Sequence, residues 1–312
     1  MIECFKIQLL HFKEGGNILD LRQGKSIFKI QCLKPLSMIN PTIIEADPFL
    51  YNHKGKLYLF YESKTMLLPG VIKMICTTDL VHWSDPIVVL QESYHLSFPF
   101  VFEDEGRIYM IPETSDDKSI RLYEAENDDL NSFRFVSELV KDFEVDKWKV
   151  SFCDSIIHKK DGMYYLFTSR LNSEGINILE LYLSRHLSGK YAPHPCSPIV
   201  CSNKVGRNAG RIMEYNGEVL RFSQDCSIRY GDNVSVSRIT VLTQNDYREE
   251  QIYENIIPTD QCFYKKGGHH FSAAELDGGI IVATDAKEYH KLIGSRIVNK
   301  LIKKLGLSIF LE

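Results

Sequence analysis

The sequence predicts an all-β protein, a five-bladed β-propeller that is followed by a C-terminal amphipathic helix. A unit made of an apolar strand, a polar turn that ends in glycine and an aromatic-rich strand recurs five times along the 312 residues. Neighbouring turn glycines lie 51 to 61 residues apart, at positions 55, 106, 162, 217 and 278. Units of roughly 40 to 50 residues with a hairpin inside each are typical of propeller blades.

The N-terminal segment is expected to take part in closing the ring. Residues 1–45 alternate weakly between apolar and polar side chains. We expect part of them to form an outer strand against the last blade, because an open propeller exposes strand edges. Within each blade the inner strand comes just before the turn, where glycine tolerates a positive φ and closes a hairpin. Three of the five turns carry an Asp-Gly or Asn-Gly pair, which favours a hairpin. We therefore assign residues 1–284 to the propeller.

Residues 285–312 follow a different pattern, with apolar side chains at helical spacing and basic side chains on the opposite face. Asp285 is placed to cap the start of a helix, and Gly306 is placed to end it. Two interpretations remain open. Either the helix docks on the propeller with its lysines in solvent, or residues 286–305 lie on the anionic inner surface of a membrane.

Composition excludes several classes of protein. The net charge of −4 gives no electrostatic basis for binding nucleic acid, and no apolar stretch approaches the ~20 residues of a membrane span. No secretory signal is predicted, so we expect the protein in the cytoplasm, with a peripheral membrane location if the helix lies on a membrane. The eight cysteines are scattered without a C-x-x-C pair, which favours reduced, packed thiols over disulfides or zinc.

The candidate catalytic residues come from one position of the repeat. The residue eight positions before each turn glycine is expected near the axis, and it is Asp47, Phe98, Asp154, Ala209 or His270. For either aspartate alone, a structural role is equally plausible, as a turn cap before Pro48 or a partner of nearby backbone. At matched positions the pair favours function, because strand interiors are poor in Asp and buried carboxylates are rarely unpaired. Paired carboxylates are what glycosyl-transfer chemistry needs.

Further polar residues are predicted to surround this pair. Glu113 is a third catalytic candidate, and Arg207 and Arg211 suit a phosphate-bearing ligand through bidentate bonds. Salt bridges from these arginines to Asp225 or Glu214 are the alternative. The other substrate-binding candidates are His95, Ser97, Asn208, Gln224, Asp225, Tyr230, His269 and His270. Adjacent residues of a regular strand point to opposite faces, so the two histidines are not expected to share a metal, and no catalytic metal is predicted.

The chain resembles two known groups of proteins. The closer resemblance, over residues 45–285, is to the N-terminal propeller-like domain of plant glucosamine inositolphosphorylceramide transferases and its free-standing bacterial relatives. It rests on Ala46–Leu50, His95–Glu103, Tyr109–Thr114, Gly206–Arg211, Gln224–Ser227, Tyr230–Gly231 and Gly268–His270. This resemblance implies a carbohydrate-active propeller in the synthesis of glycolipids or cell-surface polysaccharides.

The looser resemblance is to five-bladed furanosidase-type glycoside hydrolases. Asp47 matches their first-blade base or nucleophile, and Asp154 matches their third-blade aspartate. Where their acid glutamate is expected, in the fourth blade, this chain has Arg207-Asn208-Ala209. An alkoxide leaving group needs a proton from such an acid, whereas a phosphate leaving group does not.

Three hypotheses follow. The first is a cytoplasmic glycosyltransferase without a cofactor, which joins a sugar from a nucleotide- or phosphate-linked donor to a glycan or glycolipid acceptor. In it Asp47 is the base or nucleophile-like carboxylate and Asp154 orients the sugar, while the two arginines hold the donor phosphate. The second is a furanoside hydrolase with Glu113 or an unrecognised residue as the acid. The third is a non-catalytic propeller that binds a glycan or lipid headgroup for a separate transferase.

Overall fold

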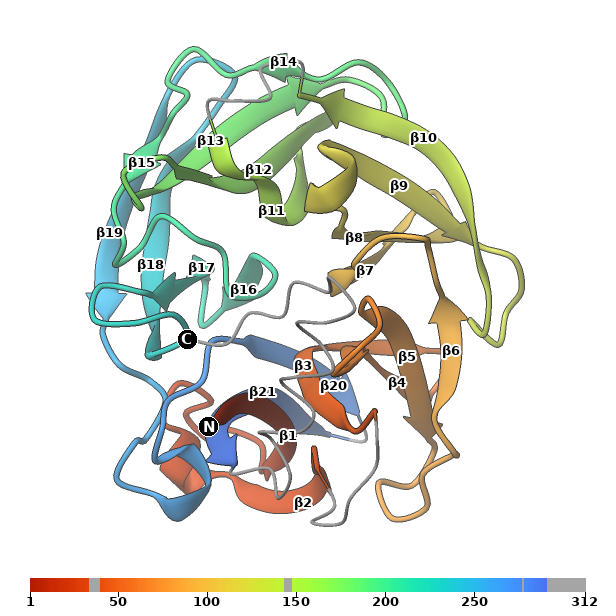
Figure 1. The fold of residues 1–312 in the computed structure, drawn as a ribbon. Coiled ribbons are helices and arrows are strands. Elements are labelled where there is room, and N and C mark those ends of the chain that lie inside the picture. Colours follow the sequence, from red (N-terminus) through yellow and green to blue (C-terminus); the bar gives the residue numbers. More distant parts are fainter. Residues whose placement is uncertain (34–39, 143–147, 277, 291–312) are drawn as a thin grey trace, which may run out of the picture.

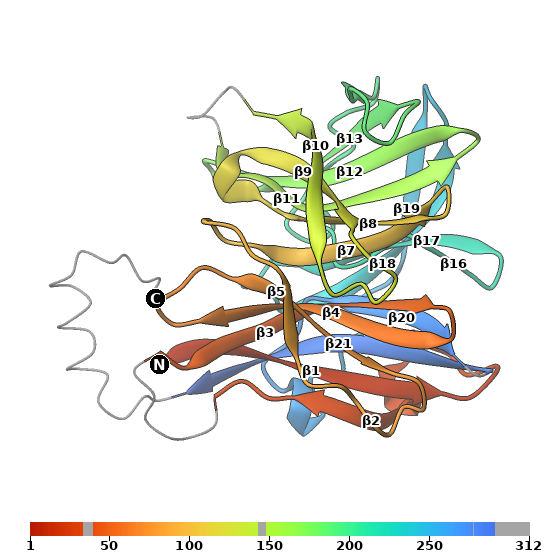
Figure 2. The same ribbon diagram turned by 90° about the vertical axis from the view of Figure 1, so that its right-hand side faces the viewer.

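The protein is a ring of β-sheets around a central axis, seen along the axis in Figure 1 and from the side in Figure 2. The computed structural model describes residues 1–33, 40–142, 148–276 and 278–290. Over these residues the secondary structure is β-strand apart from three short 3-10 helices: η1 (Leu21–Gln23), η2 (Ser115–Asp117) and η3 (Cys262–Tyr264). The predicted all-β propeller is confirmed. In the described part of the chain, no helix is long and apolar enough to cross a membrane.

The first three blades follow one another along the chain. The first consists of β3 (Thr42–His53), β4 (Lys56–Thr65), β5 (Val71–Thr77) and β6 (Ile87–Leu90). The second consists of β7 (Ser97–Asp104), β8 (Arg107–Glu113), β9 (Ser119–Ala125) and β10 (Phe133–Lys141). In the third, β14 (Ala192–Pro193) and β15 (Val200–Cys201) both pair with β13 (Asn177–Ser184), outside β11 (Trp148–Lys160) and β12 (Met163–Asn172).

The last two blades complete the ring. The fourth consists of β16 (Met213–Tyr215), β17 (Glu218–Asp225), β18 (Asn233–Leu242) and β19 (Tyr247–Tyr253). The fifth combines the two ends of the chain, β20 (Phe271–Leu276) and β21 (Gly279–His290) with β1 (Ile2–Phe12) and β2 (Lys25–Ile30). β1 pairs antiparallel with β21 from Ile2–His290 to Phe12–Ile280, so the N-terminal segment closes the ring.

The predicted helix does not begin at Asp285. Residues 285–290 belong to β21, which pairs with β1 over its whole length. Hydrogen bonds to a partner far away in the sequence therefore override the local helical spacing of apolar residues, a tertiary effect that periodicity does not detect. The predicted membrane-facing segment, residues 286–305, begins inside β21, and its part beyond His290 lies outside the described residues together with the rest of the predicted helix.

Three inner strands share an irregularity at one end of the axis. The pairing register of β3, β7 and β11 shifts around residues 47–48, 98–99 and 154–155. At each of these bulges one residue has a positive φ: 51° at Asp47, 44° at Phe98 and 51° at Asp154. Asp tolerates this conformation, whereas a bulky Phe rarely adopts it. The bulge re-aims the side chain, and its repetition makes the three positions equivalent, as the repeat predicted.

The axis beside these bulges is filled by aromatic side chains. The ring centroid of Phe49 lies 4.9 Å from that of Phe98 and 4.5 Å from that of His270, and the last two are 5.2 Å apart. All three side chains are fully buried. This packing supplies a rigid apolar floor for the polar residues at the end of the axis.

Candidate functional site

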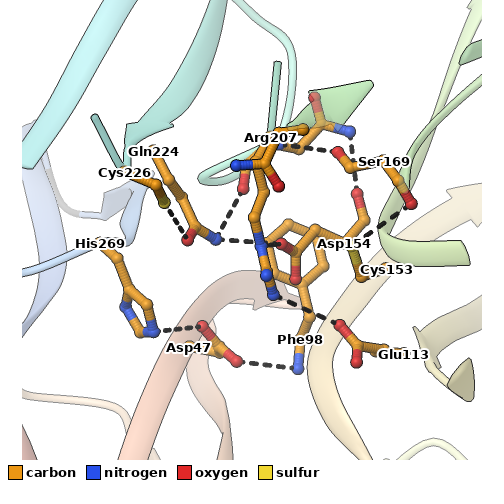
Figure 3. Close-up of polar contacts among 12 residues, drawn as sticks. Asp47, Phe98, Glu113, Cys153, Asp154, Ser169, Arg207, Gln224, Cys226 and His269 are labelled. Carbon is orange, nitrogen blue, oxygen red and sulfur yellow. Dashed lines mark hydrogen bonds and ion pairs between the residues drawn. The ribbon is translucent and has the colours of Figure 1, made fainter. Parts of the chain in front are cut away.

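Buried polar side chains from all five blades meet at the end of the axis where the inner strands begin (Figure 3). β3 and β11 contribute Asp47 and Asp154, and β8 contributes Glu113 at its last residue. Arg207 comes from the segment before β16, and His269 from the segment before β20. Such a concentration of buried charge is rare unless it is paired or functional.

Asp47 is held as a carboxylate. Its Oδ2 accepts a hydrogen bond from the backbone N–H of Phe98 at 3.1 Å, and its Oδ1 lies 3.6 Å from His270 Nδ1 and 3.9 Å from His269 Nε2. Burial raises the pKa of Asp47, but the contacts with the two histidines and with the Phe98 N–H outweigh burial and lower the pKa to about 2. Asp47 therefore stays ionised at neutral pH.

Asp285 organises the histidine side of the site. Its Oδ1 accepts hydrogen bonds from the backbone N–H groups of His269 at 2.7 Å and His270 at 3.1 Å, and its Oδ2 accepts one from the N–H of Asp47 at 3.3 Å. Oδ2 also forms an ion pair with His269 Nδ1 at 2.5 Å. Burial lowers the pKa of His269, but Asp285 and, more weakly, Asp47 and Asp154 raise it to about 9. His269 is therefore an imidazolium at neutral pH.

The prediction that His269 and His270 face opposite sides is wrong. Both precede β20, in a segment without strand geometry, and both rings contact Asp47. Close approach to the backbone requires glycine here, because a Cβ on Gly268 would lie 2.3 Å from the carbonyl oxygen of Asp285. The His270 ring is fully buried between the rings of Phe49 and Phe98, so it contacts Asp47 from the aromatic interior of the axis.

Asp154 forms the centre of a second group. Arg207 donates from Nε to Asp154 Oδ2 at 2.5 Å, and Gln224 donates from Nε2 to the same oxygen at 3.0 Å. Asn208 donates from its side chain to the backbone oxygen of Asp154 at 2.8 Å. Burial raises the pKa of Asp154, and Arg207 opposes this effect. Asn208 thus fixes the bulge, while Gln224 and Arg207 fix the carboxylate.

Glu113 differs from both aspartates in its protonation. Burial raises the pKa of its carboxyl group and nearby Asp154 raises it further, against Arg207, so that the pKa is about 8. Its Oε1 accepts a hydrogen bond from Ser115 Oγ at 2.9 Å. Its Oε2 lies 3.8 Å from Arg207 Nη2 and has no hydrogen-bond partner among the described residues. At neutral pH Glu113 is mostly a neutral acid with a proton to give.

Within this site, two sets of donors have ligand atoms within 4.8 Å of one another and could hold a metal ion: Asp47, His269 and Asp285, and Glu113, Cys153 and Asp154. In the first set a histidine with a pKa of about 9 carries a proton at neutral pH, and ligation needs the neutral ring. In the second set the cationic Arg207 already pairs with the carboxylate of Asp154. Both sets are better suited to charge pairing than to a metal.

Three other predicted residues lie at or near the rim of this cluster. His95 Nε2 lies 3.3 Å from Glu62, and its Nδ1 accepts a hydrogen bond from the N–H of Gly70. Ser97 is buried opposite Glu113 in the strand pair. The Tyr230 ring packs on Arg207 and His269 but is 41% exposed, so it lies between the cluster and solvent.

Two predicted residues point elsewhere. Arg211 donates from Nη2 to the backbone oxygens of Leu50 at 3.0 Å and Val101 at 3.1 Å, three residues beyond the bulges along β3 and β7. Burial lowers its pKa to about 10. Asp225 accepts hydrogen bonds from the backbone and side chain of Ser227, which caps a turn. Among the described residues, neither side chain pairs with Asp47, Asp154 or Glu113. Nor does Arg207 or Arg211 pair with Asp225 or Glu214, as the salt-bridge alternative required.

Sequence reasoning missed Asp285, which it treated as a helix cap. One signal was present: Asp285 follows the apolar run Ile280–Ala283, where a charged residue is unusual in a buried strand. That signal indicates a buried carboxylate but does not identify its partners.

The family model for the N-terminal region of glucosamine inositolphosphorylceramide transferase 1 matches residues 28–285. The chain belongs to this family. It is 34% identical over 264 residues to glucosamine inositolphosphorylceramide transferase 1 of Oryza sativa subsp. japonica, and 32% identical over 270 residues to that of Arabidopsis thaliana. Each alignment covers 81% of this chain but 34% of the relative, so the chain spans about a third of the length of these plant proteins.

Solved structures with a similar fold include glycoside hydrolases. A family 117 enzyme from Zobellia galactanivorans matches with a TM-score of 0.54 and 12% identity, over 82% of this chain and 92% of the other. A thermostable family 43 enzyme matches with a TM-score of 0.55 and 14% identity, over 84% and 95%. A family 32 β-fructofuranosidase from Bombyx mori matches with a TM-score of 0.54 and 14% identity, over 80% and 61%. At these identities the likeness shows the propeller fold alone.

Proposed function

We propose that this protein transfers a sugar from a phosphate-linked donor to a hydroxyl group of a glycan or glycolipid acceptor. The observation that carries the proposal is one buried site in which the ionised Asp47 has the cationic His269 beside it and the cationic Arg207 pairs with the neighbouring Asp154. Membership of a family named for a glycolipid-forming transferase supports the reaction class.

The Asp47 carboxylate is suited to stabilise the anomeric carbon of the donor sugar during the reaction. As the bond to the leaving group breaks, this carbon gains positive charge, which a fixed carboxylate stabilises in a buried site. A carboxylate with a pKa of about 2 is a weak base for an ordinary hydroxyl group. It suffices here, because the acceptor oxygen becomes strongly acidic while it bonds to the anomeric carbon.

Arg207 and His269 are the cationic side chains that we propose bind the leaving phosphate. Arg207 uses Nε for Asp154, and its Nη2 is 3.8 Å from the largely neutral Glu113, beyond hydrogen-bonding distance. That end of the guanidinium can therefore bind phosphate oxygens. In the reaction the bond from the anomeric carbon to the phosphate oxygen breaks, and the phosphate leaves with the electron pair. The acceptor oxygen forms the new bond, and its proton passes to Asp47.

A second candidate, glycoside hydrolysis, is favoured by one observation. Glu113 has a pKa of about 8 and a second oxygen without a hydrogen-bond partner among the described residues, as a general acid requires. It could protonate an alkoxide leaving group, which the transfer reaction does not need. In this second candidate, Glu113 takes the role of the acid that the fourth blade does not supply.

The test is a thermal-shift screen of the purified protein against nucleotide sugars, free nucleotides, prenyl-phosphate sugars and plain oligosaccharides, followed by a product assay on each hit. A ligand that binds only the folded state raises the melting temperature. We expect a shift with a phosphate-bearing donor that is lost in Arg207→Ala, and sugar transfer to an added acceptor.

Other outcomes would contradict the proposal. Shifts with plain sugars only, together with release of free sugar from aryl furanosides, would establish the hydrolase. Sugar binding without turnover of any donor would establish a binding module. The proposal also places the reaction in the cytoplasm, and the protein in a secreted or periplasmic fraction would contradict that part.

A further inference from the structure

In the fifth blade β1 and β21, which come from opposite parts of the chain, lie side by side (Figure 2). A second cluster of ligand-type side chains lies on this blade. Cys32 Sγ donates to Glu288 Oε1 at 3.0 Å, and His290 Nε2 lies 2.8 Å from the same oxygen. The three ligand atoms all lie within 4.8 Å of one another. A sulfur, a nitrogen and an oxygen thus converge on one point.

Cys4 adds a second sulfur. It lies directly opposite Glu288 in the pairing of β1 with β21, so both side chains project from the same face of the sheet. The Cys4 thiol also lies beside the Cys32 thiol. Both thiols are buried, whereas the side chain of His290 is 38% exposed, which leaves a route from solvent.

The two oxygens of Glu288 are divided between different partners. Oε2 pairs with the Lys6 ammonium at 2.7 Å, which leaves Oε1 to face Cys32 and His290. Carboxylates that bind metals are themselves held by hydrogen bonds from outer groups, and Lys6 supplies one here.

We propose that Cys4, Cys32, Glu288 and His290 form a structural zinc site. Zinc prefers four ligands from thiolate, imidazole and carboxylate groups in a tetrahedron, and thiolates select it over harder cations. Binding would release the two thiol protons, and the resulting three negative charges would be balanced by Zn²⁺ and Lys6. The site joins β1, the segment after β2 and the end of β21, so the metal would fasten the closure of the ring.

The test uses the full chain, free of any affinity tag, stripped with a chelator and kept under a reductant that does not bind metal. Co²⁺ is added as a spectroscopic probe, and Zn²⁺ is then added to displace it. We expect one Co²⁺ per chain with a thiolate-to-cobalt charge-transfer band, loss of that band on adding one equivalent of Zn²⁺, and a higher melting temperature with Zn²⁺.

Variants make the assignment specific. Cys32→Ser and His290→Ala should each weaken Co²⁺ binding at least tenfold, and Cys4→Ser should lose about half of the charge-transfer intensity, because one of two thiolates is removed. Cys201→Ser changes an exposed cysteine on the third blade and should match the wild type. The proposal is overturned if the wild type shows neither the band nor the zinc-dependent shift, or if the band survives in Cys32→Ser.

Discussion

The two sides of the candidate site hold carboxyl groups with opposite shifts in pKa. On one side Asp47 faces two histidines and a backbone N–H, and its pKa is about 2. On the other side Glu113 and Asp154 share a single arginine, and the pKa of Glu113 is about 8. Both carboxyl groups are almost completely buried. Because both are buried, the partners decide which one is an anion: hydrogen bonds and the cationic His269 lower the pKa of Asp47, whereas the like-charged Asp154 raises that of Glu113.

The largest expected effect comes from removing the anion. Asp47→Asn keeps the shape of the side chain but removes the charge that faces the reacting sugar. We expect turnover to fall by roughly 10³-fold, within the range of about 10²–10⁴ typical for a positioned carboxylate, while the circular dichroism spectrum stays unchanged. The measurement is steady-state turnover of whichever donor the binding screen identifies.

Asp104→Asn is the matched control for that variant. Asp104 is also a buried carboxylate, but it ends β7 at the far side of the blade and pairs with Lys159 and Tyr164. Asp104→Asn should keep turnover within about twofold of the wild-type value and lower the free energy of unfolding by about 1–3 kcal/mol. Full turnover in Asp47→Asn would remove this residue from the chemistry.

The second effect tests whether Asp285 keeps His269, the cation beside Asp47, protonated. In Asp285→Asn the His269 ring loses its closest negative partner, so its pKa should fall from about 9 toward or below its ordinary value. We expect about 100-fold lower turnover at pH 8, with the alkaline limb of the pH profile moved to lower pH, because the imidazolium is lost earlier. A merely structural role would lower activity equally at every pH, and that result would sink this assignment.

The contrast between these regions also shows what sequence could predict. Asp47, Phe98 and Asp154 were placed correctly relative to one another because the same bulge recurs at the same distance from each turn glycine. Asp285 was missed because its partners are set by the pairing of β21 with β20 and by the loop before it. The face assigned to the two histidines failed because strand alternation was applied to residues outside a strand.

The third effect separates transfer from hydrolysis at Glu113. If the reaction is transfer to a hydroxyl from a phosphate donor, Glu113→Gln should change turnover by less than about fivefold, since no proton is needed. A hydrolase should lose about 100-fold in the same variant. In the hydrolase case, wild-type activity should also fall as the pH rises through about 8. Turnover of the wild type and of Glu113→Gln, measured on both substrate classes, decides between the two mechanisms.

Stability against pH gives an independent readout of the same contrast. The folded-state pKa of Glu113 lies above its ordinary value of 4.5, so the unfolded chain loses that proton first and stability falls between pH 4.5 and about 8. The slope is at most about 1.4 kcal/mol per pH unit. Glu113→Gln should flatten it in urea titrations. Asp47 acts oppositely: its contribution is present above pH 3.8 and is lost as the pH falls toward 2.

The smallest effect separates the two arginines, which the sequence placed in one phosphate site. Arg207→Met should raise the KM for a phosphate-bearing donor about tenfold or more, because only Arg207 reaches the carboxylates. Arg211→Met should leave KM unchanged and lower stability by about 2 kcal/mol, since it removes two hydrogen bonds to the carbonyls of Leu50 and Val101. Equal effects of both variants on KM would mean that the phosphate extends down the axis to Arg211, past the aromatic floor, and the contrast between the two sides would then fail.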